Sequence, residues 1–342
     1  MSSNLSAFTP ASKADLPAFG IGSAELASRG TGCTFVAAPQ GAVCGVDVRG
    51  AAPATRETDL LRPTNTVEKV HGVMISGGSA FGLEAACGAM DELAARGIGF
   101  HLMDACVPII PGACLFDLPV GQFAYPRKEQ GAEACVNALA NLESGEDPQQ
   151  GNIGAGTGAT VAKMLGPNCA VKAGLGWHAV ALGPVVVGAL VAVNAAGCVY
   201  DPAGNLLAGM RMADGSMLDA QAALPLMMQA AAQGAGAASV AEAAAAQAAG
   251  PCANTTLGVV LTNARLTKAQ ANRLATATHD AYARSIKPVH TSNDGDCIFA
   301  MASGDVAAQP DLVAMMACEA MQQAIANAVT FATSAYGIPA IS

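Results

Sequence analysis

A threonine at residue 255 could serve as a nucleophile once the chain has been cut before it. Asn254, Thr255 and Thr256 directly precede LGVVLTN, a β-branched run that is typical of a strand. A threonine hydroxyl attacks poorly unless a base takes its proton, and the α-amine freed by a cut before Thr255 would be such a base. An α-amine has a reference pKa of about 7.7, so it is partly neutral near neutral pH. The same three residues also fit a turn followed by two β-formers.

Two aspartates form a second chemical candidate. Asp294 and Asp296 lie two residues apart in HTSNDGD (290–296), a polar turn before the apolar segment CIFAMAS. Paired carboxylates can orient an amine and take part in proton transfer, although a solvated turn has the same composition. The aspartates and the glycine resemble the start of a calcium loop. Because the later ligands of a twelve-residue loop are missing, we predict no metal site.

A glycine-rich segment, GNIGAGTG at 151–158, invites comparison with dinucleotide-binding loops. A fingerprint of that kind needs an acidic residue about 20 positions further on, at the end of a strand, and none is found there. We therefore predict close backbone packing at this segment and no cofactor.

The composition restricts the class of protein. The 342 residues are 52% hydrophobic and only 13% charged, with a net charge of −9, which excludes a disordered chain. An acidic balance without a cluster of lysine or arginine argues against nucleic acid and anionic membranes as partners. Since few charges are available to cover the surface, we expect part of the apolar excess to lie in a subunit interface of a homo-oligomer.

One stretch, 179–200, is uncharged and long enough to span a bilayer. Gly183 and Pro184 divide it into two β-branched runs, so we predict two buried strands around a turn and no membrane span. The first twenty residues lack the pattern of a signal peptide. The eleven cysteines include no CxxC pair, which is typical of buried thiols in a reducing cytoplasm, the predicted location.

The remaining patterns predict mixed helices and strands. We expect a hairpin over 33–48 with a turn at PQG, and helices at 80–96, 128–142, 268–286 and 311–331, the third opened by a capping box at Thr267. The alanine- and glycine-rich segment 222–250 is predicted to be a flexible linker. Antiparallel hairpins among helices indicate a layered α+β sandwich rather than a doubly wound sheet.

Four blocks, in order, resemble the family of L-aminopeptidase/D-esterases, β-peptidyl aminopeptidases and nylon-oligomer hydrolases. They are NTVEKVHGVMISGGSAFGLEAACG (65–88), GNIGAGTGATVAK (151–163), NTTLGVVLTNARLT (254–267) and HTSNDGDCIFA (290–300). The resemblance implies a four-layer αββα sandwich forming one domain over 1–342. It also implies self-cleavage into an α chain (1–254) and a β chain (255–342), and a homo-oligomer, namely a tetramer of α/β pairs.

The resemblance also implies roles for individual residues. Thr255 matches the nucleophile and Asn254 the residue before the cut. The other matched positions are an acidic pair near the nucleophile, an asparagine of the oxyanion hole and a catalytic lysine of the nylon-hydrolase branch, which correspond to Asp294 and Asp296, Asn194, and Lys163 respectively.

One position departs from the family. Phe116, in ACLFDL, stands where the family has a tyrosine, so an apolar wall is kept but a phenol hydrogen bond is lost. This affects the expected substrate preference and rate more than the class of reaction. Its neighbour Asp117 is a candidate partner for a substrate ammonium, and Gly78 and Ser79 are candidate backbone N–H donors to substrate.

The expected function is that of a self-processing hydrolase with an N-terminal threonine nucleophile. It would act on N-terminal amide bonds of short peptides or aminoacyl amides, as an aminopeptidase, with β-aminopeptidase activity as one option. Two alternatives stay open: acyl transfer of the kind carried out by ornithine acetyltransferases, and a non-catalytic scaffold that keeps the fold.

Overall fold

The computed structural model describes residues 7–233 and 254–341. Most of the predicted linker, 234–250, lies outside the described residues. Its first part, 222–233, belongs to the helix α3 (Ala220–Gln233).

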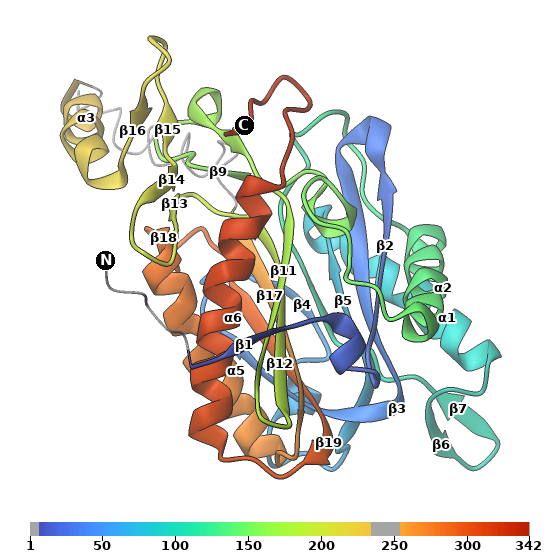
Figure 1. The fold of residues 1–342 in the computed structure, drawn as a ribbon. Helices are drawn as coiled ribbons and strands as arrows, with labels where there is room; N and C mark the ends of the chain where they lie inside the picture. The colour runs from blue at the N-terminus through green and yellow to red at the C-terminus, as the bar shows by residue number, and fades with distance from the viewer. Residues whose placement is uncertain (1–6, 234–253, 342) are drawn as a thin grey trace.

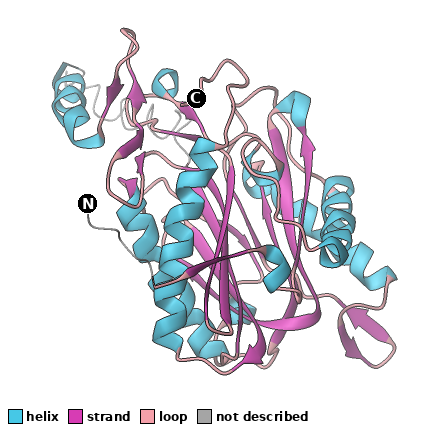
Figure 2. Ribbon diagram, viewed as in Figure 1, coloured by secondary structure: helices cyan, strands magenta, loops and turns pink. Residues whose placement is uncertain are grey.

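Most strands join one large sheet (Figures 1 and 2). Its order is β1-β11-β12-β17-β19-β3-β5-β8-β4, with β2 paired to β3. The bounds of these strands are β1 Thr9–Ala11, β2 Gly20–Leu26, β3 Thr31–Val48, β4 Ala54–Arg56, β5 Lys69–Ser76, β8 Gly112–Cys114, β11 Leu175–Leu182, β12 Val185–Asn194, β17 Thr255–Ala264 and β19 Cys297–Val306.

Shorter strands form four small sheets at the margins. They are β6 (Phe100–Leu102) with β7 (Ala105–Val107), β9 (Thr160–Val161) with β10 (Val171–Lys172), β13 (Cys198–Tyr200) with β14 (Leu206–Ala208) and β18 (Ile286–Lys287), and β15 (Met210–Arg211) with β16 (Met217–Leu218). The β6–β7 hairpin projects from the body of the molecule at the lower right of Figure 1.

Four helices complete the layers: α1 Ala85–Ala95, α2 Lys128–Ser144, α5 Lys268–Ser285 and α6 Pro310–Thr330. Three hydrophobic clusters separate the layers. One lies between α5, α6 and the strands around β12, a second between the two halves of the folded sheet, and a third between α1, α2 and the strands β2, β3 and β5. The succession is helix, sheet, sheet, helix, which confirms the predicted α+β four-layer sandwich formed by a single domain.

The predicted helices lie where their sequence signals place them. Thr267 caps α5 by accepting a hydrogen bond from the Gln270 N–H, as its capping box predicts. The helix α6 is long and apolar enough to cross a membrane by length and composition, but 61% of that window is buried inside the molecule. Its apolar side chains therefore serve the core beside β11 and β12.

The predicted hairpin over 33–48 is wrong. Residues 31–48 form one continuous strand, β3, whose register against β5 shifts between Ala37 and Ala42. Its first half pairs with β2 and its second half with β19. Gly41 takes a positive φ of 73°, so the PQG segment bends the strand without reversing it. This bend lets one strand contribute to both sheet layers.

The predicted pair of strands around Gly183 is confirmed. β11 and β12 pair antiparallel from Leu175↔Ala192 to Leu182↔Val185. On its other side β12 pairs antiparallel with β17, and the last pair in that register is Asn194↔Thr255. The end of the apolar hairpin therefore carries Asn194 to the strand neighbour of Thr255.

Candidate active site

Thr255 opens β17 in the middle of the large sheet. It is 4% exposed, and its Oγ1 donates a hydrogen bond to the carbonyl oxygen of Asn254 at 2.6 Å. β12 lies on one side of β17 and β19 lies on the other. The hydroxyl is thus held against the peptide bond that precedes it, with a strand on either side.

The loop before β19 holds the backbone on both sides of that peptide bond. The N–H of Asn254 donates to the Asn293 carbonyl at 3.3 Å, and the Asn254 carbonyl accepts from the Gly295 N–H at 2.9 Å. One residue further on, the Thr256 N–H donates to Asp296 Oδ1 at 2.7 Å. The three contacts fix the position of the peptide bond between Asn254 and Thr255.

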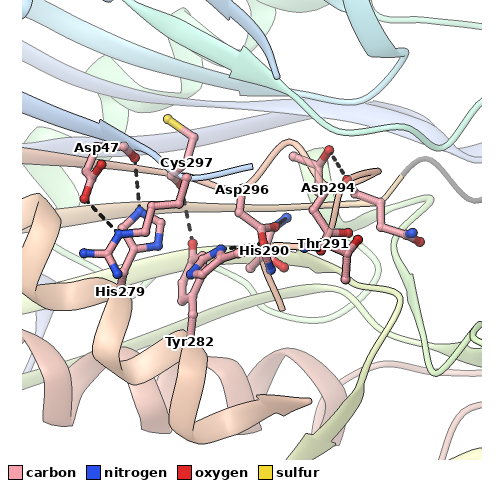
Figure 3. A network of polar contacts seen from close by, with 12 residues as sticks. Asp47, His279, Tyr282, His290, Thr291, Asp294, Asp296 and Cys297 are labelled. Carbon is pink, nitrogen blue, oxygen red and sulfur yellow. Dashed lines mark hydrogen bonds and ion pairs between the residues drawn. The ribbon is translucent and has the colours of Figure 1, made fainter. Parts of the chain in front are cut away.

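Both predicted aspartates lie buried in this loop (Figure 3). The Thr291 N–H donates to Asp294 Oδ2 at 2.6 Å, and Asp296 Oδ2 lies 2.9 Å from the His290 Nδ1. Burial, and next the charge of Asp296, raise the pKa of Asp294 above its ordinary value. Asp294 therefore retains a proton to a higher pH than a solvated aspartate does.

The His290 ring, which contacts Asp296, packs against a second imidazole, that of His279. The His290 ring lies 4.8 Å, between centroids, from that of His279, whose Nε2 lies 3.1 Å from the Asp47 carbonyl (Figure 3). Burial lowers the pKa of His279 to about 4, so this ring is neutral at neutral pH. In the sequence, the only signal of a role for His290 is that it lies close to the two aspartates. The contact of its ring with Asp296 depends on the turn of the loop.

Asn194 is fully buried and its amide has one orientation. Its Oδ1 accepts from Lys163 Nζ at 2.8 Å and from the Thr160 N–H at 3.1 Å, while its Nδ2 donates to the Phe116 carbonyl at 2.8 Å. Only an amide oxygen can accept from an ammonium and an N–H, so the NH₂ group must face the other way. One of its two N–H bonds is used by Phe116.

A small pocket of about 80 Å³ is lined by two residues that contact the Asn194 amide, Thr160 and Lys163. Thr160 and Lys163 supply its polar wall, and the rest of the lining is apolar: Phe116, Pro119, Val120, Pro167, Ala170 and Ile338. Phe116 does line this pocket with its apolar side chain. The pocket has room for a short aliphatic group.

The other predicted substrate-binding residues do not line this pocket. Asp117 is 1% exposed and its Oδ1 accepts from the Gly78 N–H at 2.7 Å; burial raises its pKa to about 6. The Ser79 N–H donates to the Leu115 carbonyl at 2.8 Å. Both predicted backbone donors therefore have acceptors within the chain, and their contact with substrate stays a prediction.

The glycine segment 151–158 packs closely, as its composition predicts. A Cβ on Gly156 would lie 2.1 Å from the Leu175 nitrogen. Lys172, which sequence reasoning did not single out, braces the segment: its buried ammonium donates to the carbonyls of Gly156 and Ala159 at 3.2 and 2.9 Å. Burial lowers the pKa of Lys172 to about 7. The braced segment leads directly into Thr160 and Lys163.

Together these residues can support acyl transfer to and from a hydroxyl. Thr255 is the candidate nucleophile and Asn194 a candidate amide donor. The two aspartates lie in the loop that holds Asn254 and Thr256, and Lys163 donates to the Asn194 amide. Within the described parts of the chain, no group of three His, Cys, Asp or Glu side chains is placed to hold a metal ion.

A model of Peptidase family S58 matches residues 13–340. An uncharacterised aminopeptidase of Mycobacterium tuberculosis is 40% identical over 288 residues, covering 82% of this chain and 75% of the relative. A 6-aminohexanoate-oligomer endohydrolase of Paenarthrobacter ureafaciens is 30% identical over 298 residues, covering 85% and 75%.

Two solved structures resemble the fold. A β-aminopeptidase from Burkholderia has a TM-score of 0.64 at 17% identity, with 98% of this chain and 92% of the other covered. An L-aminopeptidase D-Ala-esterase/amidase from Ochrobactrum anthropi has a TM-score of 0.66 at 17% identity and the same coverage, and is described as a variant of the Ntn hydrolase fold.

Proposed function

This chain belongs to peptidase family S58, and from that premise we propose that it is a self-processing aminopeptidase whose nucleophile is Thr255. The observation that carries the proposal is the Thr255 hydroxyl, held 2.6 Å from the carbonyl oxygen of the peptide bond it would cut. The cut would leave an α chain of residues 1–254 and a β chain of residues 255–342.

Maturation proceeds through an ester. Thr255 Oγ1 attacks the carbonyl carbon of Asn254, a C–O bond forms, and the hydroxyl proton passes to the peptide nitrogen as the C–N bond breaks. Water then hydrolyses the ester, giving the Asn254 carboxylate and regenerating the Thr255 hydroxyl beside a free α-amine. That amine is the base for every later turnover.

Turnover repeats the attack on a substrate amide. The α-amine of Thr255 takes the hydroxyl proton, Oγ1 attacks the substrate carbonyl, and the leaving amine receives the proton. The second N–H of Asn194 Nδ2 stabilises the oxyanion, a contribution of about 3 kcal/mol for a single donor. Water then releases the acyl group from Thr255.

The pocket lined by Thr160 and Lys163 favours small acyl groups. Its volume of about 80 Å³ and its apolar lining suit a short aliphatic chain, and the ammonium of Lys163 disfavours a cationic side chain there. We therefore propose short peptides and aminoacyl amides with small aliphatic side chains as substrates. β- and ω-aminoacyl amides are a further option, in which the ammonium at the end of the chain lies outside this pocket.

We also propose a cytoplasmic homo-oligomer that binds neither nucleic acid nor membranes. Its net charge of −9 supports the second part. The projecting β6–β7 hairpin supports the homo-oligomer, because a single chain leaves three apolar side chains of the hairpin exposed to solvent: Phe100, Leu102 and Met103.

Intact mass spectrometry of the purified protein tests the proposal. We expect two fragments, the smaller beginning with Thr255, and hydrolysis of a panel of aminoacyl anilides. Thr255→Ala should stay uncut and inert, while Thr255→Ser should be cut. Thr256→Val is the matched control, since the Thr256 hydroxyl has no hydrogen-bond partner among the described residues.

Two outcomes would contradict it. A wild-type protein of 342 residues with full activity would exclude the self-exposed amine as the base. Exchange of an acetyl group between acetyl-ornithine and ornithine, without hydrolysis of the anilides, would favour the acyl-transfer alternative.

A further inference from the structure

The carbonyl oxygen of Asn254 needs a donor during the cut. When Thr255 Oγ1 attacks, negative charge develops on this oxygen, and a fixed N–H aimed at it lowers the barrier. Two hydrogen bonds to it are described, from Thr255 Oγ1 and from the Gly295 N–H. The hydroxyl is consumed as the nucleophile, so it cannot stabilise the charge it creates.

We propose that the Gly295 N–H is the oxyanion donor for the cut between Asn254 and Thr255, an inference that rests on the proposed function. The N–H already donates to the Asn254 oxygen at 2.9 Å. It therefore needs no rearrangement when the carbonyl carbon becomes tetrahedral.

The loop around Gly295 is fixed independently of the scissile bond. The Asp294 N–H donates to the Thr291 carbonyl at 3.1 Å, and the Asp294 carbonyl accepts from the Ala52 N–H at 2.9 Å. The Thr291 N–H returns to the Asp294 carboxylate. These contacts orient the peptide that carries the Gly295 N–H, so the donor is preorganised.

Space also explains the glycine. A Cβ on residue 295 would lie 2.8 Å from Thr255 Oγ1 and 3.0 Å from the Ala52 carbonyl. A side chain here would crowd the nucleophile that the N–H assists. Gly295→Ala keeps the N–H and adds only this crowding, so it does not test the donor.

Maturation and turnover then use donors from opposite strands. Gly295 lies at the β19 side of Thr255, whereas Asn194 lies at the β12 side. In the uncut chain, Asn194 Nδ2 donates to the Phe116 carbonyl. The Gly295 N–H serves the cut, and the Asn194 amide is oriented for the substrate.

The test removes one N–H and adds no side chain. Glycolic acid is inserted in place of Gly295 by nonsense suppression in cell-free translation, which replaces the amide by an ester. We expect the cut to slow by about 100-fold to 1,000-fold, the usual effect of losing one oxyanion donor. Cleavage within about threefold of the unmodified chain would overturn the inference and leave the proposed function intact. An unmodified chain that stays whole would instead remove the proposed function.

The matched control is an ester at Asn293, made with the hydroxy analogue of asparagine. The Asn293 N–H lies in the same loop, 3.4 Å from Thr291 Oγ1, and does not contact Asn254. We expect this chain to be cut at close to the normal rate and to melt within a few degrees of the Gly295 ester. An equal slowing of both esters would overturn the inference.

Hydroxylamine separates the two steps of the cut, because it cleaves an ester that has already formed. It also cleaves the backbone ester placed before residue 295, so the readout is the residue at which each released fragment begins. If the donor acts on the first attack, hydroxylamine should release residues 295–342 and no fragment that begins at Thr255. Rapid appearance of a fragment that begins at Thr255 would overturn the inference.

A measurement on Thr255→Ala needs no ester and no cleavage. In that chain the Gly295 N–H still donates to the Asn254 oxygen, whereas the Thr255 hydroxyl is gone. A ¹³C label at the Asn254 carbonyl should absorb in the infrared at a lower frequency than a labelled carbonyl without a donor. A band at the position of such a free carbonyl would overturn the inference.

Discussion

Asp117 shows how burial changes the chemistry of a single residue. The sequence placed it beside Phe116 as a candidate for a substrate ammonium. In the fold its side chain is buried and accepts a hydrogen bond from the Gly78 N–H. Its adjacency in sequence was correct, but the direction of its side chain depends on the turn at Gly78, where φ is +83°. The residue types around Asp117 therefore do not predict which way its side chain points.

Asp117→Asn should stabilise the protein at pH 8 and change little at pH 4. The folded pKa of about 6 exceeds the ordinary value of 3.8, so the favourable contribution of the protonated form is complete below the unfolded pKa and is lost as pH rises through 6. The difference is at most about 3 kcal/mol. Urea unfolding between pH 4 and 8, in a Thr255→Ala background, measures it.

The control for this prediction is Asp104→Asn at an exposed aspartate. Its effect on the free energy of unfolding should be small, because the side chain is exposed. If the stability difference between Asp117→Asn and its parent were constant from pH 4 to pH 8, Asp117 would be ionised at no cost in the fold.

At the scale of elements, periodicity and capping predicted the helices and the β11–β12 hairpin well, because both signals are local. β3 was misread because Pro39, Gln40 and Gly41 have the composition of a reversing turn. In the fold, the first half of the strand pairs with β2 and the second half with β19, so the chain continues through the segment instead of reversing. Whether such a segment reverses or continues depends on the strands beside it, which the residue types within it do not reveal.

The glycine segment offers a sharper case. Its close packing was predicted, but the lysine that braces it was not, because Lys172 lies beyond the segment and reaches it only in the fold. The ammonium donates to the carbonyls of Gly156 and Ala159. These residues closely precede Thr160 and Lys163, which donate hydrogen bonds to Asn194. The position of Asn194 thus depends on an element that carries no catalytic side chain.

Lys172→Met should destabilise the protein by about 3 kcal/mol, because it leaves buried carbonyls without a donor. It should also lower turnover about tenfold by displacing Thr160 and Lys163. Chemical unfolding and anilide hydrolysis measure the two effects. Lys69→Met, at an exposed position in β5, is the control. Equal behaviour of the two variants would show that Lys172 braces nothing.

For the molecule as a whole, the proposed cut lies inside the main sheet. Residues 255–342 supply β17 and β19, which lie between β12 and β3 in the strand order, and the helices α5 and α6 that cover them. Separation of the two fragments would expose the clusters on both faces of the sheet. The hydrophobic free energy holding the fragments together is correspondingly large.

The fragments should therefore co-elute on size exclusion after the cut, and should separate only in denaturant. Electrophoresis of the eluted peak under denaturing conditions gives the check. Elution of residues 255–342 as a separate species in native buffer would contradict the sheet order as the source of cohesion.

Oligomerisation is testable at the projecting hairpin. Met103 is 95% exposed, and Met103→Glu together with Leu102→Glu should shift the protein to a smaller species by placing charge in an apolar subunit contact. Light scattering after size exclusion measures the mass. Met228→Glu, at an exposed methionine of α3, is the control. An unchanged mass in the double variant would exclude the hairpin as a contact.

The position of the loop 290–296 in the chain also determines when, during translation, the proposed cut can occur. Asn254 and Thr255 leave the ribosome before the loop that holds their peptide bond, and before β19, the parallel partner of β17. A nascent chain that ends short of this loop lacks the Gly295 N–H and the aspartates. The proposed cut would therefore wait until translation has passed them, so that an unfinished polypeptide would not release its own first 254 residues as a fragment with an incomplete sheet.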